Sequence, residues 1–178
     1  MKFLVLVASL ALTPPPAAAE TYVIHGSTAD ELKREMRQKG PKGFWGYTNA
    51  SYRWRFNYTA EGAQCRITSA TVTEEIVVTL PVWGDKDRAP ACLQRDWERM
   101  LRLLTAHEHN HRDKWQGTRE RIRAKLLTVT GACNVAAMEL AANAAGSAEV
   151  AKTQALQVQY DRETNHGQSE GVTLNDCR

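Results

Sequence analysis

The sequence has little histidine, no strong excess of charge and no long apolar stretch beyond its first residues. Its 23 Lys and Arg residues nearly balance 20 Asp and Glu residues, so the chain lacks the basic footprint of a nucleic-acid-binding protein. After the leader, no stretch reaches the roughly 20 apolar residues that a membrane helix needs. Repeats and long low-complexity linkers are also absent. These absences predict a globular protein without a nucleic-acid partner and without an integral membrane segment.

The first residues have the three parts of a secretory signal peptide. Lys2 gives a positive start, residues 3–12 are apolar, and Ala17 to Ala19 form a small-residue cleavage site. Cleavage before Glu20 is expected, which gives a signal peptide of residues 1–19 and a periplasmic or secreted product. No Cys follows the apolar run, so no lipid anchor is expected. Residues 20–178 have about the length of one ordinary domain, so a single domain is predicted.

The chain has four cysteines, Cys65, Cys92, Cys133 and Cys177. An even number of cysteines in an exported protein favours two disulfides, and four cysteines allow three pairings. None of them has the two-residue spacing of a cysteine zinc site. We prefer the pairs Cys65–Cys92 and Cys133–Cys177, because each would tie one flank of the central helix described next to a neighbouring segment.

Hydrophobic periodicity predicts an α+β fold, with strands first and helices later. Aromatic and polar residues alternate strictly over residues 52–58, as in a strand with one buried face, and β-branched residues make 65–80 one or two further strands. Apolar residues recur every three or four positions from Leu93, which predicts a central helix over about 91–115. The other expected elements are a strand at 21–24 and helices from Ser27 or Thr28 to Gly40, over 119–127, and over 134–145 and 148–164, with a break at Gly146.

The central helix carries the densest chemistry of the chain, since it holds three of the five histidines. At helical spacing His107 and His111 lie one turn apart on one face, so their imidazoles can converge on one cation. They continue the buried apolar face, where uncompensated polar groups would be costly. Glu108 follows a ligand in sequence and is assigned as the general base that activates a water on zinc. His109 falls on another face and is not expected to bind the metal.

The third protein ligand of this predicted zinc site must come from elsewhere in the chain. The metzincin extension is excluded, because positions 114 and 117 carry Lys and Gly rather than Gly and His. The remaining histidines are His25 and His166, and His166 belongs to a polar cluster that begins at Tyr160. His166 is the predicted ligand, with Asp161 as the alternative ligand or as a carboxylate that orients an imidazole. Tyr160 is expected to donate a hydrogen bond to the developing oxyanion. A plain helix end with exposed polar residues is the other interpretation of this cluster.

Motifs along nearly the whole mature chain match the pattern of a single family. They are the signal peptide, Gly43-Phe44-Trp45-Gly46-Tyr47-Thr48, His107-Glu108-His109-Asn110-His111, Cys133-Asn134, and Tyr160-Asp161-Arg162-Glu163-Thr164-Asn165-His166-Gly167. On these motifs the chain resembles a bacterial family of predicted secreted zinc-dependent proteases, catalogued as a domain of unknown function. Asn110 departs from the family, which often has Gly at this non-ligand position. The resemblance implies a zincin-like fold, with a small antiparallel sheet packed on a central active-site helix and further C-terminal helices, and it favours His166 as the ligand.

The first functional hypothesis is an exported zinc metallopeptidase that acts on a peptide or protein substrate. Its residues would be the Zn²⁺ ligands His107, His111 and His166, the general base Glu108, and the transition-state donor Tyr160. The segment 65–80 is then expected to offer a strand edge to an extended substrate. The second hypothesis is a non-catalytic exported binding module with a structural zinc, in which Asp161 or His25 closes the fourth position. The number of protein ligands separates the two hypotheses.

Overall fold

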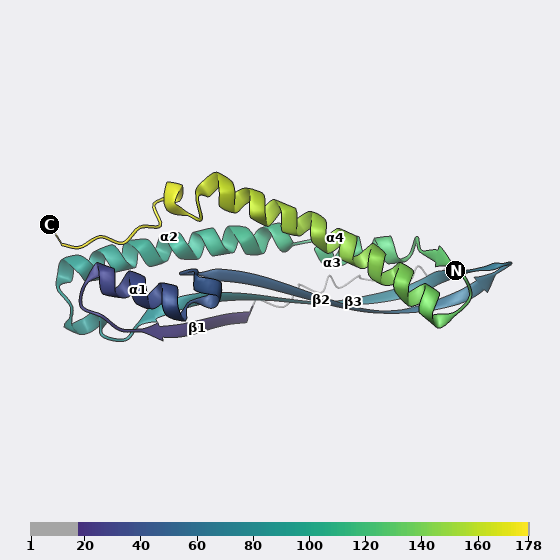
Figure 1. The fold of residues 1–178 in the computed structure, drawn as a ribbon, viewed down its shortest axis with the longest axis horizontal. Coiled ribbons are helices and arrows are strands. Elements are labelled where there is room, and N and C mark those ends of the chain that lie inside the picture. The colour runs from purple at the N-terminus through teal and green to yellow at the C-terminus, as the bar shows by residue number, and fades with distance from the viewer. Residues whose placement is uncertain (1–17, 178) are drawn as a thin grey trace, which may run out of the picture.

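The computed structural model describes residues 18–177, and in it the helices α2, α3 and α4 lie along one side of a long, narrow sheet (Figure 1). Residues 1–17, which make up most of the predicted signal peptide, are outside the described residues. The elements in chain order are β1 (Ala18–Ile24), α1 (Ala29–Lys39), η1 (Pro41–Gly43), β2 (Tyr47–Glu61), β3 (Gln64–Trp83), η2 (Lys86–Arg88), α2 (Ala91–Trp115), α3 (Thr118–Leu126), β4 (Thr130–Gly131), α4 (Val135–Thr164) and η3 (Gln168–Glu170). The α+β class is confirmed, and none of the described helices has the length and apolar character needed to cross a membrane.

The sheet is built around β3, a single strand of 20 residues. β2 pairs with it in antiparallel register, β4 pairs antiparallel with its first residues, and β1 pairs in parallel with its last part. The expectation of a purely antiparallel sheet is therefore wrong, because β1 runs in the same direction as β3. The edge expected at 65–80 is covered only at its two ends, by β4 at Cys65 and Arg66 and by β1 from residue 77 onward. Within the described chain, residues 68–76 have β2 as their one strand partner. Among residues 18–177, β2 has a strand partner on one edge only.

One face of β3 stays apolar although the positions of its buried residues change. Cys65 and Ile67 are buried in the first part of the strand, and Ala70 and Val72 are buried in the next part. The pairing with β2 skips Thr68 at this point, so Thr68 is the extra residue of a β-bulge. The bulge keeps both sets of apolar side chains on the face that the helices cover.

The long helix α2 has the bounds expected from its periodicity, belongs to one hydrophobic cluster at its beginning, and approaches a second at its end, where Trp115 lies 5.9 Å from Tyr52 between ring centroids. At its beginning, Leu93 and Met100 join Leu32 and Met36 of α1 in the first cluster. The second cluster fills the space between the hairpin β2–β3, α3 and the first half of α4, with Ile67, Ile122, Leu126, Met138 and Ala142 as buried members. The segment of α2 between these clusters contains His107, Glu108 and His111, all of them buried. The polar motif therefore lies at the junction of two apolar cores.

Helix α4 continues without a break through Gly146, so the predicted division into two helices is wrong. Gly146 is buried against Trp54 of β2, and a Cβ at this position would lie 2.8 Å from the indole ring. The Trp54 Nε1 donates a hydrogen bond to Asn143 Oδ1 at 3.0 Å, one turn earlier on α4. Glycine is thus required here by the close approach of the helix to the sheet.

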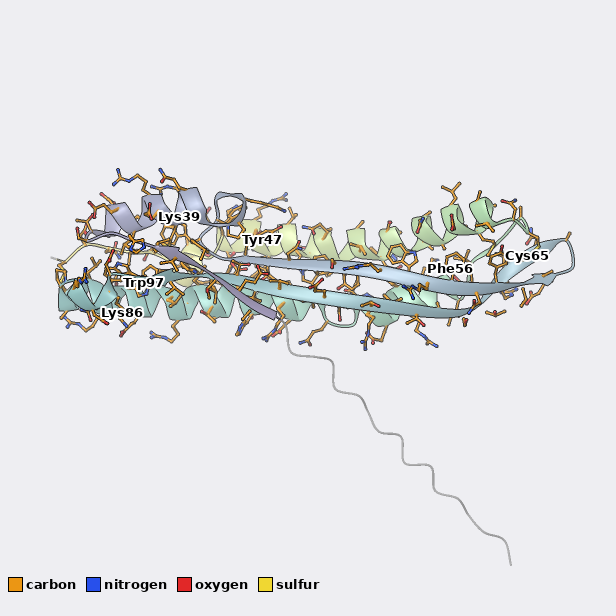
Figure 2. The ribbon with its side chains drawn as sticks, turned by 90° about the horizontal axis from the view of Figure 1, so that it is seen from below. Lys39, Tyr47, Phe56, Cys65, Lys86 and Trp97 are labelled. Atoms are coloured by element: carbon orange, nitrogen blue, oxygen red, sulfur yellow. A yellow bond between two sulfur atoms is a disulfide. The ribbon has the colours of Figure 1, made fainter. Side chains whose placement is uncertain are left out.

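Two disulfides are present, but the expected pairing is wrong: Cys65 bonds to Cys133 and Cys92 bonds to Cys177. Figure 2 shows Cys65 at the hairpin end of the molecule and Trp97, which follows Cys92 on α2, at the opposite end. A 20-residue strand is about 65 Å long, and β3 separates the first two cysteines by most of this length. The short strand β4, whose Gly131 pairs with Cys65, instead brings Cys133 alongside.

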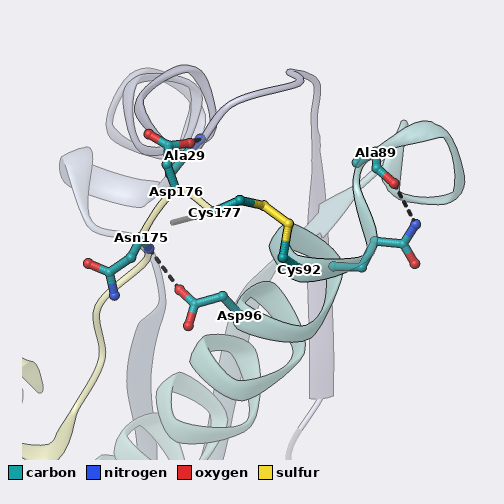
Figure 3. The surroundings of a disulfide bond; sticks show 8 residues. Ala29, Ala89, Cys92, Asp96, Asn175, Asp176 and Cys177 are labelled. Atoms are coloured by element: carbon teal, nitrogen blue, oxygen red, sulfur yellow. Dashed lines mark hydrogen bonds between the residues drawn. A yellow bond between two sulfur atoms is a disulfide. The ribbon is translucent and has the colours of Figure 1, made fainter.

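The C-terminal tail, residues 171–177, is fastened along α2 and α1 (Figure 3). Arg99 of α2 donates hydrogen bonds to the carbonyl oxygens of Gly171 and Thr173, at 2.9 and 2.7 Å. Asp96 accepts a hydrogen bond from the Asn175 backbone N–H at 2.7 Å. Asp176 accepts one from the first N–H of α1, at 2.7 Å, where a helix favours a negative group. With the Cys92–Cys177 bond, these contacts fix the tail to the first cluster.

Substitution of Gly146 by valine is expected to destabilise the protein by about 2 kcal/mol, because added atoms would overlap the Trp54 ring in a packed contact. Thermal and urea unfolding followed by circular dichroism would measure the change. The exposed neighbour Ser147→Val is the control, since it adds the same β-branched side chain to the same helix. Equal stability of the two variants would show that the close approach of α4 to β2 does not require glycine.

Candidate metal centre

A cleft of about 570 Å³ opens beside the middle of α2. The floor is α2 itself, from Leu104 to Trp115, and one wall is formed by residues 43–50, which lead into β2. The opposite wall comes from α4 and from residues 172–175 of the tail, and α1 closes one end. Its volume is within the range of ligand-binding pockets, roughly 300–1,000 Å³.

Three metal-binding groups converge at the floor of this cleft, His107, His111 and Asp161. The two Nε2 atoms of the histidines are 3.2 Å apart. Asp161 Oδ1 lies 3.0 Å from His111 Nε2 and 3.4 Å from His107 Nε2. Ligand atoms around a tetrahedral zinc with bonds of about 2.0 Å are separated by about 3.3 Å. The three atoms are therefore spaced like three corners of such a tetrahedron, and the cluster could hold a metal ion.

The second ring nitrogen of His111 identifies its tautomer. His111 Nδ1 is 2.6 Å from Gln157 Oε1, while the Gln157 amide nitrogen donates to the His111 carbonyl oxygen at 3.3 Å. An amide oxygen only accepts hydrogen bonds, so His111 Nδ1 carries the proton. In this tautomer the Nε2 lone pair of His111 points into the cluster.

The tautomer of His107 is set by a carboxylate, that of Glu170. Glu170 Oε2 lies 2.8 Å from His107 Nδ1, and Tyr160 donates its hydroxyl proton to Glu170 Oε1 at 2.7 Å. Burial of Glu170 opposes its ionisation, but the hydrogen bonds from Tyr160 and His107 outweigh this effect and lower the pKa of Glu170. Glu170 is therefore an acceptor, and His107 Nδ1 is the donor. The Nε2 lone pair of His107 is directed to the same point as that of His111.

Three acceptor atoms that meet without a donor need a cation between them. Burial opposes protonation of His107, but its contacts with Asp161 and Glu170 outweigh burial and raise the pKa of His107. Burial likewise opposes ionisation of Asp161, but His107 and His111 outweigh it and lower the pKa of Asp161. Both pKa shifts show that a positive charge is stabilised between His107, His111 and Asp161. Either a proton or a metal ion can supply this charge.

Glu108 stands beside the cluster and outside it. Its side chain is buried, and Thr48 Oγ1 of β2 donates a hydrogen bond to Glu108 Oε2 at 2.8 Å. On the other side, a Cβ at Gly46 would lie 2.7 Å from Glu108 Oε1. Burial raises the pKa of Glu108 above its usual value, although the hydrogen bond from Thr48 acts in the opposite direction. A carboxyl whose affinity for a proton is raised by burial is suited to accept and return one.

His166, the predicted third ligand, lies next to the cluster but is not one of its three members. Its Nδ1 is 3.4 Å from Asp161 Oδ1, and its side chain is 52% exposed. The ring rests against Phe44 of the opposite wall, with 5.3 Å between ring centroids. Asn165 and His166 both have left-handed backbone conformations, with φ of 48° and 52°, which cost energy for residues other than glycine. The structure thus brings the alternative ligand Asp161 into the cluster and leaves His166 at its rim.

The remaining predicted residues have different positions. Tyr160 lies behind His107, with 4.9 Å between ring centroids, and its hydroxyl is bonded to Glu170 and Asn110 rather than directed into the cleft. Its role as an oxyanion donor stays a prediction. His25 follows β1 and contacts Asp85 at 2.9 Å, away from the cluster. His109 is also outside the cluster, as expected.

Sequence reasoning missed three residues that support the centre, Gln157, Glu170 and Thr48. Gln157 precedes Asp161 by four positions, so the two share one face of α4 and meet the two histidines of α2 in register. That spacing was a usable signal. Thr48, the second residue of β2, ends the glycine-rich and aromatic motif of residues 43–48, but nothing in the pattern of this motif indicates contact with Glu108. Glu170 reaches His107 only because the chain turns sharply at residues 165–167.

Comparison with known proteins gives one match. The sequence model of a family described as "Bacterial protein of unknown function (DUF922)" matches residues 19–167. The matched range includes the three members of the cluster and Glu108, and it ends before Glu170. No curated protein and no solved structure matches the chain.

Loss of either supporting contact is expected to weaken metal binding by about 10- to 100-fold, because the ring nitrogens would no longer be held in the binding tautomer. Gln157→Leu tests the contact to His111, and Glu170→Leu tests the contact to His107. Competition with a chromophoric chelator would measure Zn²⁺ and Co²⁺ affinity. The exposed Glu163→Gln on α4 is the control, and affinities equal to that control would refute the support role.

Proposed function

The chain belongs to the bacterial family described as a bacterial protein of unknown function (DUF922), and from the site within it we propose an exported zinc-dependent peptidase. The observation that carries this proposal is the convergence of two Nε2 atoms and one carboxylate oxygen at tetrahedral spacing beside a buried glutamate. The two disulfides are compatible with an oxidising, extracytoplasmic location. The predicted signal peptide, with export to the periplasm or the medium, is part of the proposal.

Zinc fits the donor set better than the harder divalent cations do. Imidazole nitrogen is a preferred zinc ligand, whereas calcium and magnesium select oxygen ligands. The proposed ligands are His107, His111 and Asp161, in a zincin-like arrangement with two histidines one turn apart on a helix. Three protein ligands beside an open cleft are typical of catalytic zinc, because the fourth position stays available to water and substrate.

The residues around the cluster can perform proton transfer in peptide hydrolysis. A zinc ion bound here supplies Lewis acidity, which polarises the scissile carbonyl and lowers the pKa of water at the site. Glu108 is placed to take a proton from the attacking water and to return it to the leaving amine. Thr48 holds one oxygen of Glu108, and the absence of a side chain at Gly46 leaves room for the other oxygen. Glu170 and Gln157 keep the two imidazoles in position.

The substrate of this proposal is an extended peptide that pairs with the outer edge of β2. Thr48 ties the first residues of β2 directly to Glu108, so this edge runs past the reacting centre. Strand addition at a sheet edge holds a peptide by its main chain and suits substrates of varied sequence. We place the substrate at β2 rather than at the edge expected at 65–80, because Thr48 of β2 is bonded to Glu108. The non-catalytic module with structural zinc is less well supported, since it needs a fourth protein ligand and the cluster has three.

The first test of this function is the metal content of purified protein. Wild type is expected to contain about one zinc per chain by mass spectrometry, and His107→Ala and Asp161→Ala should lose most of it, because a catalytic site depends on its three protein ligands. His166→Ala, at the rim of the cluster, should keep its zinc. Unchanged zinc in His107→Ala would refute the site. Loss in His166→Ala with retention in Asp161→Ala would assign His166 as the third ligand.

The second test concerns the general base. Glu108→Gln should lower peptide hydrolysis by about 10² to 10⁴ while zinc is retained, because glutamine cannot accept the proton. Gly46→Ala should also lower the rate, since its Cβ would displace Glu108 Oε1. A quenched fluorescent peptide library would supply the substrates. Gly131→Ala is the glycine control, because its Cβ would make only a contact of 3.4 Å, with Met138. Full activity of zinc-loaded Glu108→Gln would refute the mechanism.

A further inference from the structure

We propose that the cleft selects a peptide with a carboxylate on the C-terminal side of the scissile bond, and that Arg37 of α1 binds this carboxylate. The inference rests on the proposed function, because it names the substrate class of the same cleft. The carboxylate can be an acidic side chain or the C-terminal carboxylate of the peptide, since both present the same group.

The two ends of the cleft differ in charge. At the end closed by α1, Lys33 and Arg37 line the cleft. At the opposite end the lining residues are uncharged, with Asn49, Gln154 and Trp115 among them. A carboxylate is therefore attracted to the α1 end, and nothing charged competes for it at the other end.

Arg37 is the basic residue of the cleft with no ion-pair partner among residues 18–177. Lys33 Nζ is paired with Asp30 at 3.0 Å, and the nearby Lys39 is paired with Glu35. Arg37 has neither an ion pair nor a side-chain hydrogen bond in the described part of the chain, and it is exposed. Its guanidinium carries donors arranged in a fork that matches a carboxylate.

The acidic groups of the cleft have other partners, so they do not neutralise Arg37. Glu108 is buried and accepts a hydrogen bond from Thr48, and Asp161 contacts the two ring nitrogens of the cluster. A peptide carboxylate can therefore bind at Arg37 without displacing an internal pair.

The direction of the peptide follows from the direction of β2. β2 begins at Tyr47, beside the centre, and runs away from α1 toward Trp54, which contacts α4. Antiparallel pairing is slightly more stable than parallel pairing. A peptide that pairs antiparallel to β2 has its N-terminal part along β2 and its C-terminal part toward α1. Arg37 then meets a residue that follows the cleaved bond.

The experiment measures binding of fluorescein-labelled peptides to zinc-loaded Glu108→Gln by fluorescence anisotropy. The peptides are identical except for Glu or Gln at each position in turn, and each has either a free acid or an amide at its C-terminus. A carboxylate on the C-terminal side is expected to tighten binding about five- to tenfold. Introducing Arg37→Gln should remove this preference. Arg37→Glu should reverse it, so that a further peptide with Lys at the preferred position binds more tightly than its Glu counterpart. Arg34→Gln, on the same helix but outside the cleft lining, should leave it unchanged.

The possible outcomes separate this inference from the peptidase proposal. If binding prefers a carboxylate and depends on Arg37, while the wild type hydrolyses no peptide, the inference is supported and the peptidase proposal is refuted. Hydrolysis of Glu and Gln peptides at equal rates, with equal affinities, refutes the inference and leaves the peptidase intact. Lack of peptide binding, or equal effects of Arg34→Gln and Arg37→Gln, also overturns the inference.

Discussion

The convergence of three acceptor atoms on one point is the interaction on which the rest of this structure depends. His107 and His111 come from α2, Asp161 comes from the last turns of α4, and Glu170 follows the end of α4. α2 and the end of α4 are distant in sequence. The Nδ1 protons of His107 and His111 are donated to Glu170 and Gln157, so a cation is needed between the two Nε2 atoms and Asp161. The length of α2, the continuity of α4 through Gly146 and the fastening of the tail all serve to bring these groups together.

The centre lies between two apolar clusters rather than inside either of them. One cluster joins α1, the start of α2 and the tail, and the other joins the hairpin, α3 and the first half of α4. Each disulfide fastens one end of the molecule, with Cys92–Cys177 at the first cluster and Cys65–Cys133 at the second. The middle of the molecule, where α2 and α4 meet, is left for polar side chains. Because each apolar cluster is packed at its own end of the molecule, the cleft between them interrupts neither cluster.

Local patterns predicted what depends on local physics. The buried face of α2 was readable from its periodicity, and the same periodicity placed His107 and His111 side by side. The choice between Asp161 and His166 as third member is harder to read, because it depends on how α4 packs against α2. The four-residue spacing of Gln157 and Asp161 is the one local signal that favours Asp161. The disulfide pairing is also beyond local patterns, because a 20-residue strand between two cysteines makes nearness in sequence a poor measure of nearness in space. The continuity of α4 is hidden for a different reason, because Gly146 has the local pattern of a helix break, whereas its role is a tertiary contact with Trp54.

The open edge of β2 has one more consequence. A strand edge that can accept a peptide can also accept the same edge of a second copy of the protein, which is a route to aggregation. Arg53 and Arg55 are exposed on this strand, and an antiparallel pair of two copies about Trp54 would bring these like charges close together. The sequence of β2 therefore combines two properties, an accessible backbone for a partner strand and a positive charge that discourages self-association.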